Sequence, residues 1–177
     1  QGSFLFIFFI LICLGVIIYE WHMMSKKKSY RIFGFIFILI SFYTIYKLRI
    51  DNDYWFLLFI TIICVSTDIG GYIFGKIFKG PKLTKFSPNK TYAGMIGGYL
   101  LSILTAIILT NFYFSNDLLI KWYIFVILIS TISQLGDIII SYFKRLSKIK
   151  DTGKIIPGHG GLLDRVDGMI FAFPFSY

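Results

Sequence analysis

The residues best suited to chemistry gather near the end of the chain, in the stretch 134–168. This stretch carries Asp137, Asp164 and Asp167, several basic side chains between them, and the run Gly-His-Gly-Gly at 158–161. Mg²⁺ prefers oxygen donors and usually takes one or two carboxylates, completing its shell with water and substrate phosphates. Charge at the ends of apolar helices is costly and is usually kept for function. The stretch therefore predicts a site for a divalent metal and a polyphosphate at a membrane surface.

The first part of this stretch continues an apolar run and is expected to be helical through about residue 147. Asp137, Ser141 and Arg145 are four apart, and Lys144 lies three beyond Ser141, so they share one helix face. A carboxylate beside a Lys-Arg pair suits a metal ligand next to phosphate-binding cations. The alternative is a buried ion pair that only fixes helix packing. Because a guanidinium grips phosphate bidentately, Arg145 is expected to matter more than Lys144.

Glycine and proline interrupt the next segment, 150–161, which cannot be a regular helix. Glycines let backbone N–H groups approach phosphate oxygens closely, and His159 can donate to a phosphate or shuttle a proton. Asp164 and Asp167 are three apart, so they share a face at the start of the next helix, with Arg165 between them. Carboxylates at a helix N-terminus can also be simple caps. That alternative suits Asp164 better than Asp167.

A second group of candidates lies upstream. Asp68 and Tyr72 share a face of the apolar run 54–75, where neighbouring glycines allow close helix approach. A turn-rich basic loop follows at 79–94, with hydroxyl groups at Ser87 and Thr91 beside Lys90. We interpret this loop as a phosphate-binding loop rather than a solvated spacer.

The elements that must position these residues are membrane helices. The chain is 56% hydrophobic, 20% aromatic and only 15% charged, which is typical of a membrane protein and not of a soluble domain. The runs that can cross a bilayer are 4–19, 32–48, 54–75, 93–114 and 118–142. A sixth run begins near residue 162, so we expect five to six transmembrane helices. Because the sequence opens on Gln1 and not on Met, we interpret the chain as a fragment of a longer protein.

The basic residues are distributed unevenly. Fourteen of the 18 Lys and Arg residues lie in the loops 20–31, 76–92 and 143–161. Basic loops tend to stay in the cytoplasm, so these three loops are expected on the cytoplasmic side, with the N-terminus opposite. Both groups of candidates then face the cytoplasm. For the first loop, orientation without any binding role explains the charge equally well.

Residues 141–167 resemble the signature of the phosphatidate cytidylyltransferases, also called CDP-diacylglycerol synthases. The signature positions are filled by Ser141, Lys144, Arg145, Lys150, Asp151, Pro157, His159, Gly160, Gly161, Asp164, Arg165 and Asp167. Upstream, Asp68-x-x-Gly-Tyr and Ser87-Pro-x-Lys-Thr resemble a second family region, which usually has an acidic residue where this chain has Ala93. The resemblance covers about 54–177, the expected catalytic region. It leaves 1–53 as N-terminal transmembrane helices.

This resemblance implies an all-α polytopic membrane enzyme that transfers a cytidylyl group from CTP to phosphatidic acid, giving CDP-diacylglycerol and pyrophosphate with Mg²⁺. It implies metal ligands at Asp137, Asp164 and Asp167, and further catalytic groups at Lys144, Arg145, His159 and Arg165. It implies substrate binding by Asp68, Tyr72, Ser87, Lys90, Thr91, Ser141, Lys150, Asp151, Gly160 and Gly161. The implied partners are CTP, phosphatidic acid and the lipid bilayer of a bacterial inner membrane, with no nucleic acid and with a homodimer left open.

Three other functions stay open. An ion or proton transporter can be built around intramembrane carboxylates such as Asp68 and Asp137, but it leaves the long loop before Asp167 unexplained. A CTP-dependent polyprenol kinase would share the substrate chemistry but would need a different signature. The third is an inactive, truncated relative. The Asp-Gly-x-x-Ala-Arg pattern of CDP-alcohol phosphotransferases is absent from the sequence.

Overall fold

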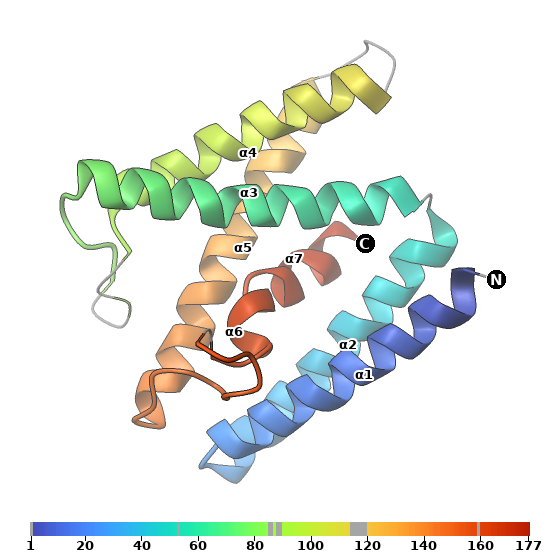
Figure 1. Ribbon diagram of the computed structural model, residues 1–177, viewed down its shortest axis with the longest axis vertical. Helices are drawn as coiled ribbons and strands as arrows, with labels where there is room; N and C mark the ends of the chain where they lie inside the picture. Colours follow the sequence, from blue (N-terminus) through green and yellow to red (C-terminus); the bar gives the residue numbers. More distant parts are fainter. Residues whose placement is uncertain (1, 53, 85–86, 88–89, 114–119, 159) are drawn as a thin grey trace.

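The computed structural model describes residues 2–52, 54–84, 87, 90–113, 120–158 and 160–177. These residues form helices and no β-strand (Figure 1). The helices are α1 (Gly2–Met24), α2 (Lys28–Asp51), α3 (Tyr54–Phe78), α4 (Tyr92–Tyr113), α5 (Ile120–Leu146), α6 (Leu163–Val166) and α7 (Met169–Ser176).

Helices α1 to α5 are long and apolar enough to cross a membrane. Each satisfies its backbone hydrogen bonds within itself, as a hydrocarbon environment requires. Each also begins and ends within about five residues of the run predicted from the sequence. The prediction of an all-α polytopic membrane protein is therefore confirmed.

The sixth predicted run is not one helix. It begins where expected, but α6 is a single turn, and Asp167 and Gly168 separate it from α7. Helix α7 lies inside the bundle, in contact with α2, α3 and α5 (Figure 1). A Cβ atom at Gly168 would lie 2.7 Å from the carbonyl oxygen of Ser133 on α5, so only glycine permits this approach. The close contact holds Asp167 against the polar face of α5.

Helices α3 and α4 are packed closely along much of their length (Figure 1). A Cβ atom at Gly94 would lie 2.6 Å from the carbonyl oxygen of Gly71. The prediction that glycines beyond Asp68 allow close helix approach is thus confirmed. The contact places Asp68 beside the start of α4, where the second basic loop ends.

Two buried apolar clusters hold the bundle together, and α7 contributes to both. The first joins α2, α3, α4, α5 and α7 through Leu48, Phe59, Ile60, Ile63, Cys64, Ala106, Val126, Ile129, Ala172 and Phe173. The second joins α1, α2, α5, α6 and α7 through Ile17, Trp21, Met24, Ile38, Phe42, Ile140, Leu163 and Ile170. The short C-terminal helices are therefore fixed on several sides by apolar packing.

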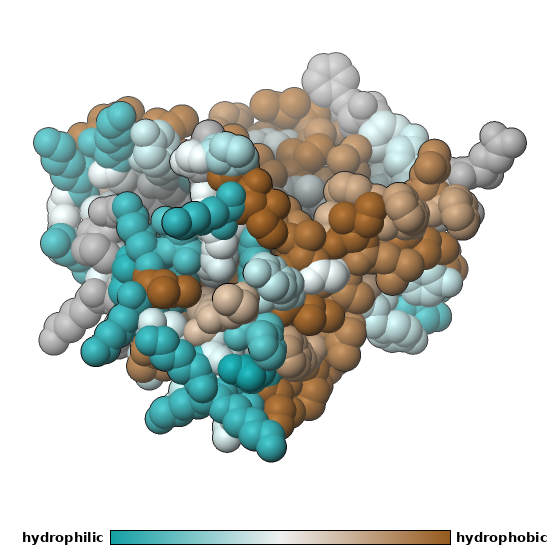
Figure 2. Space-filling view, turned by 60° about the horizontal axis from the view of Figure 1, so that its bottom comes forward, coloured by the Kyte–Doolittle hydropathy of each residue, from teal (hydrophilic) through white to brown (hydrophobic). Residues whose placement is uncertain are grey.

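The three basic loops lie at the same end of the bundle. Figure 1 shows the α1–α2 turn, the α3–α4 connection and the α5–α6 connection on one side, and the α2–α3 turn on the other. Figure 2 shows hydrophilic side chains gathered mainly over one part of the surface, beside a continuous hydrophobic surface. This arrangement agrees with the predicted shared side, which stays a prediction. Which side of the membrane it faces stays a prediction.

Candidate active site

The two groups of sequence candidates meet in one polar cavity of about 500 Å³. Its walls come from α3, the start of α4 and the loop before it, α5, the α6–α7 junction and the loop 147–162, which we call the signature loop. The predicted residues in its lining are Asp68, Tyr72, Ser87, Lys90, Thr91, Asp137, Lys144, Asp151, Asp164, Arg165 and Asp167. Segments almost 100 residues apart in sequence therefore form a single site.

The polar face of α5 is organised around Asp137. The Ser141 hydroxyl donates to Asp137 Oδ1 at 3.2 Å, which confirms that these two residues share this face. Lys90 reaches in from the loop before α4 and forms an ion pair with Asp137 Oδ2. Its Nζ also donates to the carbonyl oxygen of Gln134 at 3.5 Å. The second basic loop is thus tied to α5 by a charged contact inside the cavity.

Asp164 is held by three donors. Its Oδ1 accepts from Lys144 Nζ at 2.8 Å, and its Oδ2 accepts from the backbone N–H groups of Thr152 and Gly161 at 2.8 and 2.9 Å. Burial by itself raises the pKa of Asp164, but these hydrogen bonds outweigh burial and hold the pKa below its ordinary value. Asp164 therefore joins α5 to two separate points of the signature loop.

Replacing Asp164 by asparagine should lower the stability of the protein at neutral pH, because it leaves the buried Lys144 charge unpaired. Breaking such a pair costs about 3–5 kcal/mol. Because the folded pKa is lowered, the contribution of Asp164 is present above its ordinary value of 3.8 and is lost as the pH falls through the folded pKa. The gap in thermal midpoint between wild type and Asp164→Asn in detergent should be wide at pH 7 and shrink below pH 3.8.

Asp51→Asn is the matched control, because Asp51 forms an ion pair with Lys47 at 3.5 Å at the opposite end of the bundle and its side chain is 38% exposed. Exposed pairs contribute little to stability. A midpoint for Asp164→Asn that equals the Asp51→Asn midpoint at pH 7 would show that the buried pair does not stabilise the fold.

Asp167 lies between α6 and α7 and is buried, with its Oδ1 accepting from the Gly168 N–H at 2.9 Å. Burial raises the pKa of Asp167 well above its ordinary value, and the negative charges of Asp137 and Asp68 raise it further. Lys144 and Lys90 act in the opposite direction. The carboxylates from α3, α5 and the α6–α7 junction are thus close enough to influence one another.

The donor set of the cavity fits a hard divalent cation that is also held by substrate. Within the described parts of the chain, no group of three or more His, Cys, Asp or Glu side chains is arranged to hold a metal by itself. Mg²⁺ needs only one or two carboxylates when phosphates complete its shell, and Asp137 and Asp167 supply them in one cavity. Asp164 lies in the same cavity, where Lys144 and the backbone N–H groups of Thr152 and Gly161 already hold it. The ligand set of all three stays a prediction.

The remaining predicted residues lie outside this cavity or at its edge. Lys150 and Gly160 line an adjoining outer cavity of about 490 Å³, together with Lys154 and Gly158. Asp151 and Arg165 line both cavities, so the outer one continues the site. Ser141 reaches the site through Asp137, and the Gly161 N–H holds Asp164. His159 lies outside the described residues.

The two neighbouring cations on α5 differ in their surroundings. Lys144 is buried and lines the cavity, whereas Arg145 is exposed and is not among the described residues that line it. Arg145 Nη1 donates to the Ile149 carbonyl at 3.2 Å, just beyond the end of α5. A catalytic role for Arg145 stays a prediction, but this contact favours a role in shaping the helix end.

Glu20 was missed by the sequence reasoning, although it is the only glutamate in the chain. It lies near the end of α1, is 1% exposed, and accepts hydrogen bonds from the signature loop and the start of α6. A carboxylate directly at the end of an apolar run is costly and therefore informative. That signal was present, but nothing in the spacing pointed to partners more than 130 residues away.

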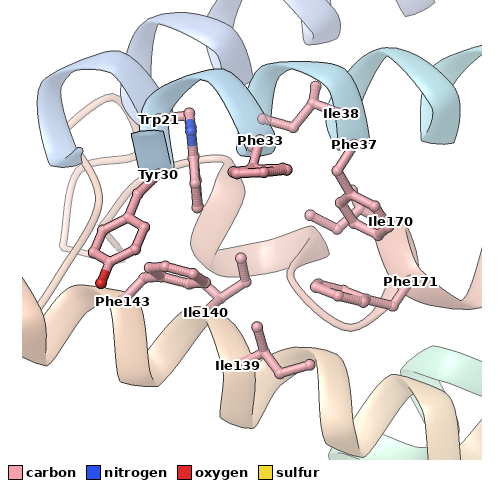
Figure 3. Close-up of a pocket in the computed structure, with 11 residues that line it drawn as sticks. Trp21, Tyr30, Phe33, Phe37, Ile38, Ile139, Ile140, Phe143, Ile170 and Phe171 are labelled. Carbon is pink, nitrogen blue, oxygen red and sulfur yellow. The ribbon is translucent and has the colours of Figure 1, made fainter. Parts of the chain in front are cut away.

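A separate cavity of about 290 Å³ lies between α2, α5 and α7. Figure 3 shows Phe33, Phe37, Ile139 and Ile140 around this space, with Trp21 and Phe171 at its edges. Among the described residues that line it, no side chain is charged, so none would hold a metal or a polyphosphate. The polar cavity on the Asp137 face of α5 is therefore the candidate active site.

Membrane-spanning helices around a cavity of carboxylates, lysines and glycine-rich backbone define a membrane enzyme that handles phosphate groups. The particular family follows from comparison of the sequence. The chain belongs to the cytidylyltransferase family, whose family model matches residues 4–177. The match therefore includes α1 and α2, beyond the region 54–177 in which the motifs were recognised. The proposed boundary between N-terminal helices and catalytic region at residue 53 stays a prediction.

Several curated relatives carry the name phosphatidate cytidylyltransferase. The protein of Rickettsia felis is 38% identical over 97% of this chain and 79% of its own length. That of Rickettsia typhi is 40% identical over the same shares. That of Staphylococcus saprophyticus is 34% identical over 93% of this chain and 65% of its own length. The chain thus spans most, but not all, of the length of the relatives it matches.

Proposed function

We propose that this protein transfers a cytidylyl group from CTP to phosphatidate, giving CDP-diacylglycerol and pyrophosphate. The observation that carries the proposal is the polar cavity, in which both groups of signature residues meet at the end of membrane-spanning helices. The family match and the names of the relatives support the same reaction.

The geometry suits attack of a lipid phosphate oxygen on the α-phosphorus of CTP while the bond to pyrophosphate breaks. Such transfers depend mainly on positioning and on neutralising negative charge. Lys144 in the inner cavity, and Lys150, Lys154 and Arg165 in the outer one, form a path of cations along which a triphosphate can lie. A phosphate monoester has its second pKa near 6, so the attacking oxygen is largely ionised at neutral pH and needs no general base.

Mg²⁺ is the proposed cofactor, held by Asp137 and Asp167, and when bound it would neutralise charge on the phosphates and on the leaving pyrophosphate. Lys90 holds Asp137 from one side and Ser141 from the other, so the carboxylate is oriented before substrate arrives. The cavity lies at the basic end of the bundle, where the headgroup of a membrane lipid and a soluble nucleotide can both reach it.

The proposed location is a bacterial inner membrane, with the cavity open to the cytoplasm, where CTP is found. The basic loops at the cavity end agree with this orientation. They also suit an anionic lipid surface. A homodimer and the absence of nucleic-acid partners stay predictions.

Single cysteines placed at Lys26, Lys82 and Lys150 should all be labelled from the cytoplasmic side of intact membranes. A cysteine at Lys121, at the other end of α5, should be labelled only from outside. The native Cys13 and Cys64 are first replaced by alanine, so that only the introduced cysteine can be labelled. Both lie within membrane-spanning helices, where alanine is a suitable replacement. Labelling of positions 82 and 150 from opposite sides would contradict both the topology and a site shared by their loops.

Purified protein in detergent should convert labelled CTP into a lipid-linked product only when phosphatidate and Mg²⁺ are both present. This assay is the direct test of the proposed reaction. It also separates the alternatives. An inactive relative would give no product, and an ion transporter built around Asp68 and Asp137, which the family match does not favour, would move ions without needing CTP.

A further inference from the structure

We infer that Glu20, on the first transmembrane helix, is a positioning residue that sets the signature loop in its active conformation. This inference rests on the proposed function, because the loop it holds carries Lys150 and Lys154, two of the cations proposed to bind the triphosphate. No motif points to Glu20, and it lies in the part of the chain where only generic spans were recognised.

Glu20 connects three points that are separate in sequence. Its Oε1 accepts from the Leu162 N–H at 2.9 Å, and its Oε2 accepts from the Leu163 N–H at 2.8 Å. Oε2 also accepts from the Thr152 hydroxyl at 3.2 Å. Leu162 and Leu163 start α6, whose first N–H groups have no partner within the helix. One carboxylate thus satisfies the beginning of α6 and ties it to the middle of the signature loop.

Two glycines of the loop lie directly against this carboxylate. A Cβ atom at Gly161 would be 2.6 Å from each Glu20 oxygen, and one at Gly153 would be 2.7 Å from Oε1. Both distances are below a real van der Waals contact, so a side chain at either position would push against the Glu20 carboxylate. Gly161, the last glycine of the Gly-His-Gly-Gly run, is therefore explained by the fold, since it makes room for Glu20 and for the Thr152 hydroxyl.

The contacts of Glu20 lead directly into the catalytic cavity. Thr152, whose hydroxyl binds Glu20, donates its N–H to Asp164, and Asp164 holds Lys144. Leu163 is fully buried in the cluster that packs α6 against α1. A shift of the loop away from Glu20 would therefore move Asp164 and Lys144, and with them the neighbouring Asp167. Glu20 acts on the reaction through these residues and does not itself line the cavity.

The test compares wild type with Glu20→Gln. Glutamine has the same shape, but only one of its two terminal atoms can accept a hydrogen bond, so it cannot satisfy both backbone N–H groups. Thr110→Val is the matched control. Thr110 is a buried polar residue far along α4 whose hydroxyl bonds only to its own helix, at the Ala106 and Ile107 carbonyls, in the described structure.

Two readouts are measured on each purified variant. The first is the concentration of CTP and of Mg²⁺ that gives half-maximal transfer, together with kcat. The second is the rate at which trypsin cuts after Lys150 and Lys154, both exposed in the loop, followed by mass spectrometry. The second readout needs no activity, so it still reports on the loop if the proposed reaction fails.

We expect Glu20→Gln to lower kcat at least about tenfold, because small displacements of positioning groups are costly. We also expect it to raise the half-maximal concentrations and to speed cleavage of the loop, while Thr110→Val resembles wild type. A purely structural role would reduce the amount of folded protein but leave the half-maximal concentrations and the cleavage rate of the folded fraction unchanged, and that result would overturn the inference.

If Glu20→Gln does not fold, Thr152→Val, which removes one of the three contacts, should shift both readouts in the same direction. Wild-type values for that variant would overturn the inference equally.

Discussion

Replacing Asp137 by asparagine should reduce cytidylyl transfer by at least about 100-fold, the loss expected when one group that stabilises developing charge is removed. Asparagine keeps the shape and the contact with Ser141 but removes the anionic oxygens that suit Mg²⁺. The variant should also need more Mg²⁺ for half its residual rate. The measurement is the initial rate of product formation over a Mg²⁺ titration at saturating CTP and phosphatidate.

The ion pair with Lys90 gives Asp137 a second role that this experiment must separate from the first. If Asp137 served only to hold Lys90, Lys90→Met would do equal harm, and neither variant would change the Mg²⁺ requirement. If Asp137 binds the metal, only Asp137→Asn shifts that requirement. Asp51→Asn, at the opposite end of the bundle, controls for loss of a carboxylate near the membrane surface and should keep the wild-type rate.

The sequence alone was sufficient to predict the five membrane-spanning helices and the residues on one face of the site. Apolar run length determines the spans, because an interior of hydrocarbon leaves the backbone few alternatives to a helix. The four-residue spacing of Asp137 and Ser141 placed them together, since both belong to one regular helix. Local periodicity can make such predictions because it depends only on helix geometry.

The contacts between elements could not be predicted in the same way. Glu20 binds residues more than 130 positions away, and its role depends on α6 packing against α1. The sixth apolar run is long enough to suggest one helix, but Gly168 must approach Ser133 closely, and the run divides there. Both features arise from tertiary packing, on which spacing along the chain gives no information.

Lys144 and Arg145 give a second example of an arrangement that spacing along the chain could not predict. Neighbours on a helix point about 100° apart, and the sequence does not say which direction is inward. Chemical preference for a bidentate guanidinium favoured Arg145. In the structure, Lys144 reaches Asp164 at 2.8 Å, while Arg145 is exposed and donates to the Ile149 carbonyl, so we now expect Lys144 to matter more.

Lys144→Gln should therefore lower the rate of transfer at least about 100-fold, whereas Arg145→Gln should lower it by less than about threefold. The two residues are adjacent, carry the same charge and leave the same helix, so each is the matched control of the other. The rates are measured at saturating CTP, phosphatidate and Mg²⁺. Equal losses of rate would contradict this expectation. A larger loss for Arg145→Gln would support the prediction from the sequence that Arg145 matters more than Lys144.

A second variant shows whether Lys144 acts on the substrate or only balances Asp164. Lys144→Gln leaves the Asp164 carboxylate without its charged partner, which costs stability by itself. Replacing both partners, as in Lys144→Gln with Asp164→Asn, removes both buried charges together, and such paired replacements are often nearly neutral for stability. If Lys144 binds a phosphate group, the double variant should regain its thermal midpoint but not its rate. Recovery of the rate together with the midpoint would show that Lys144 is only the counter-ion of Asp164, and that the cations of the outer cavity hold the nucleotide without it.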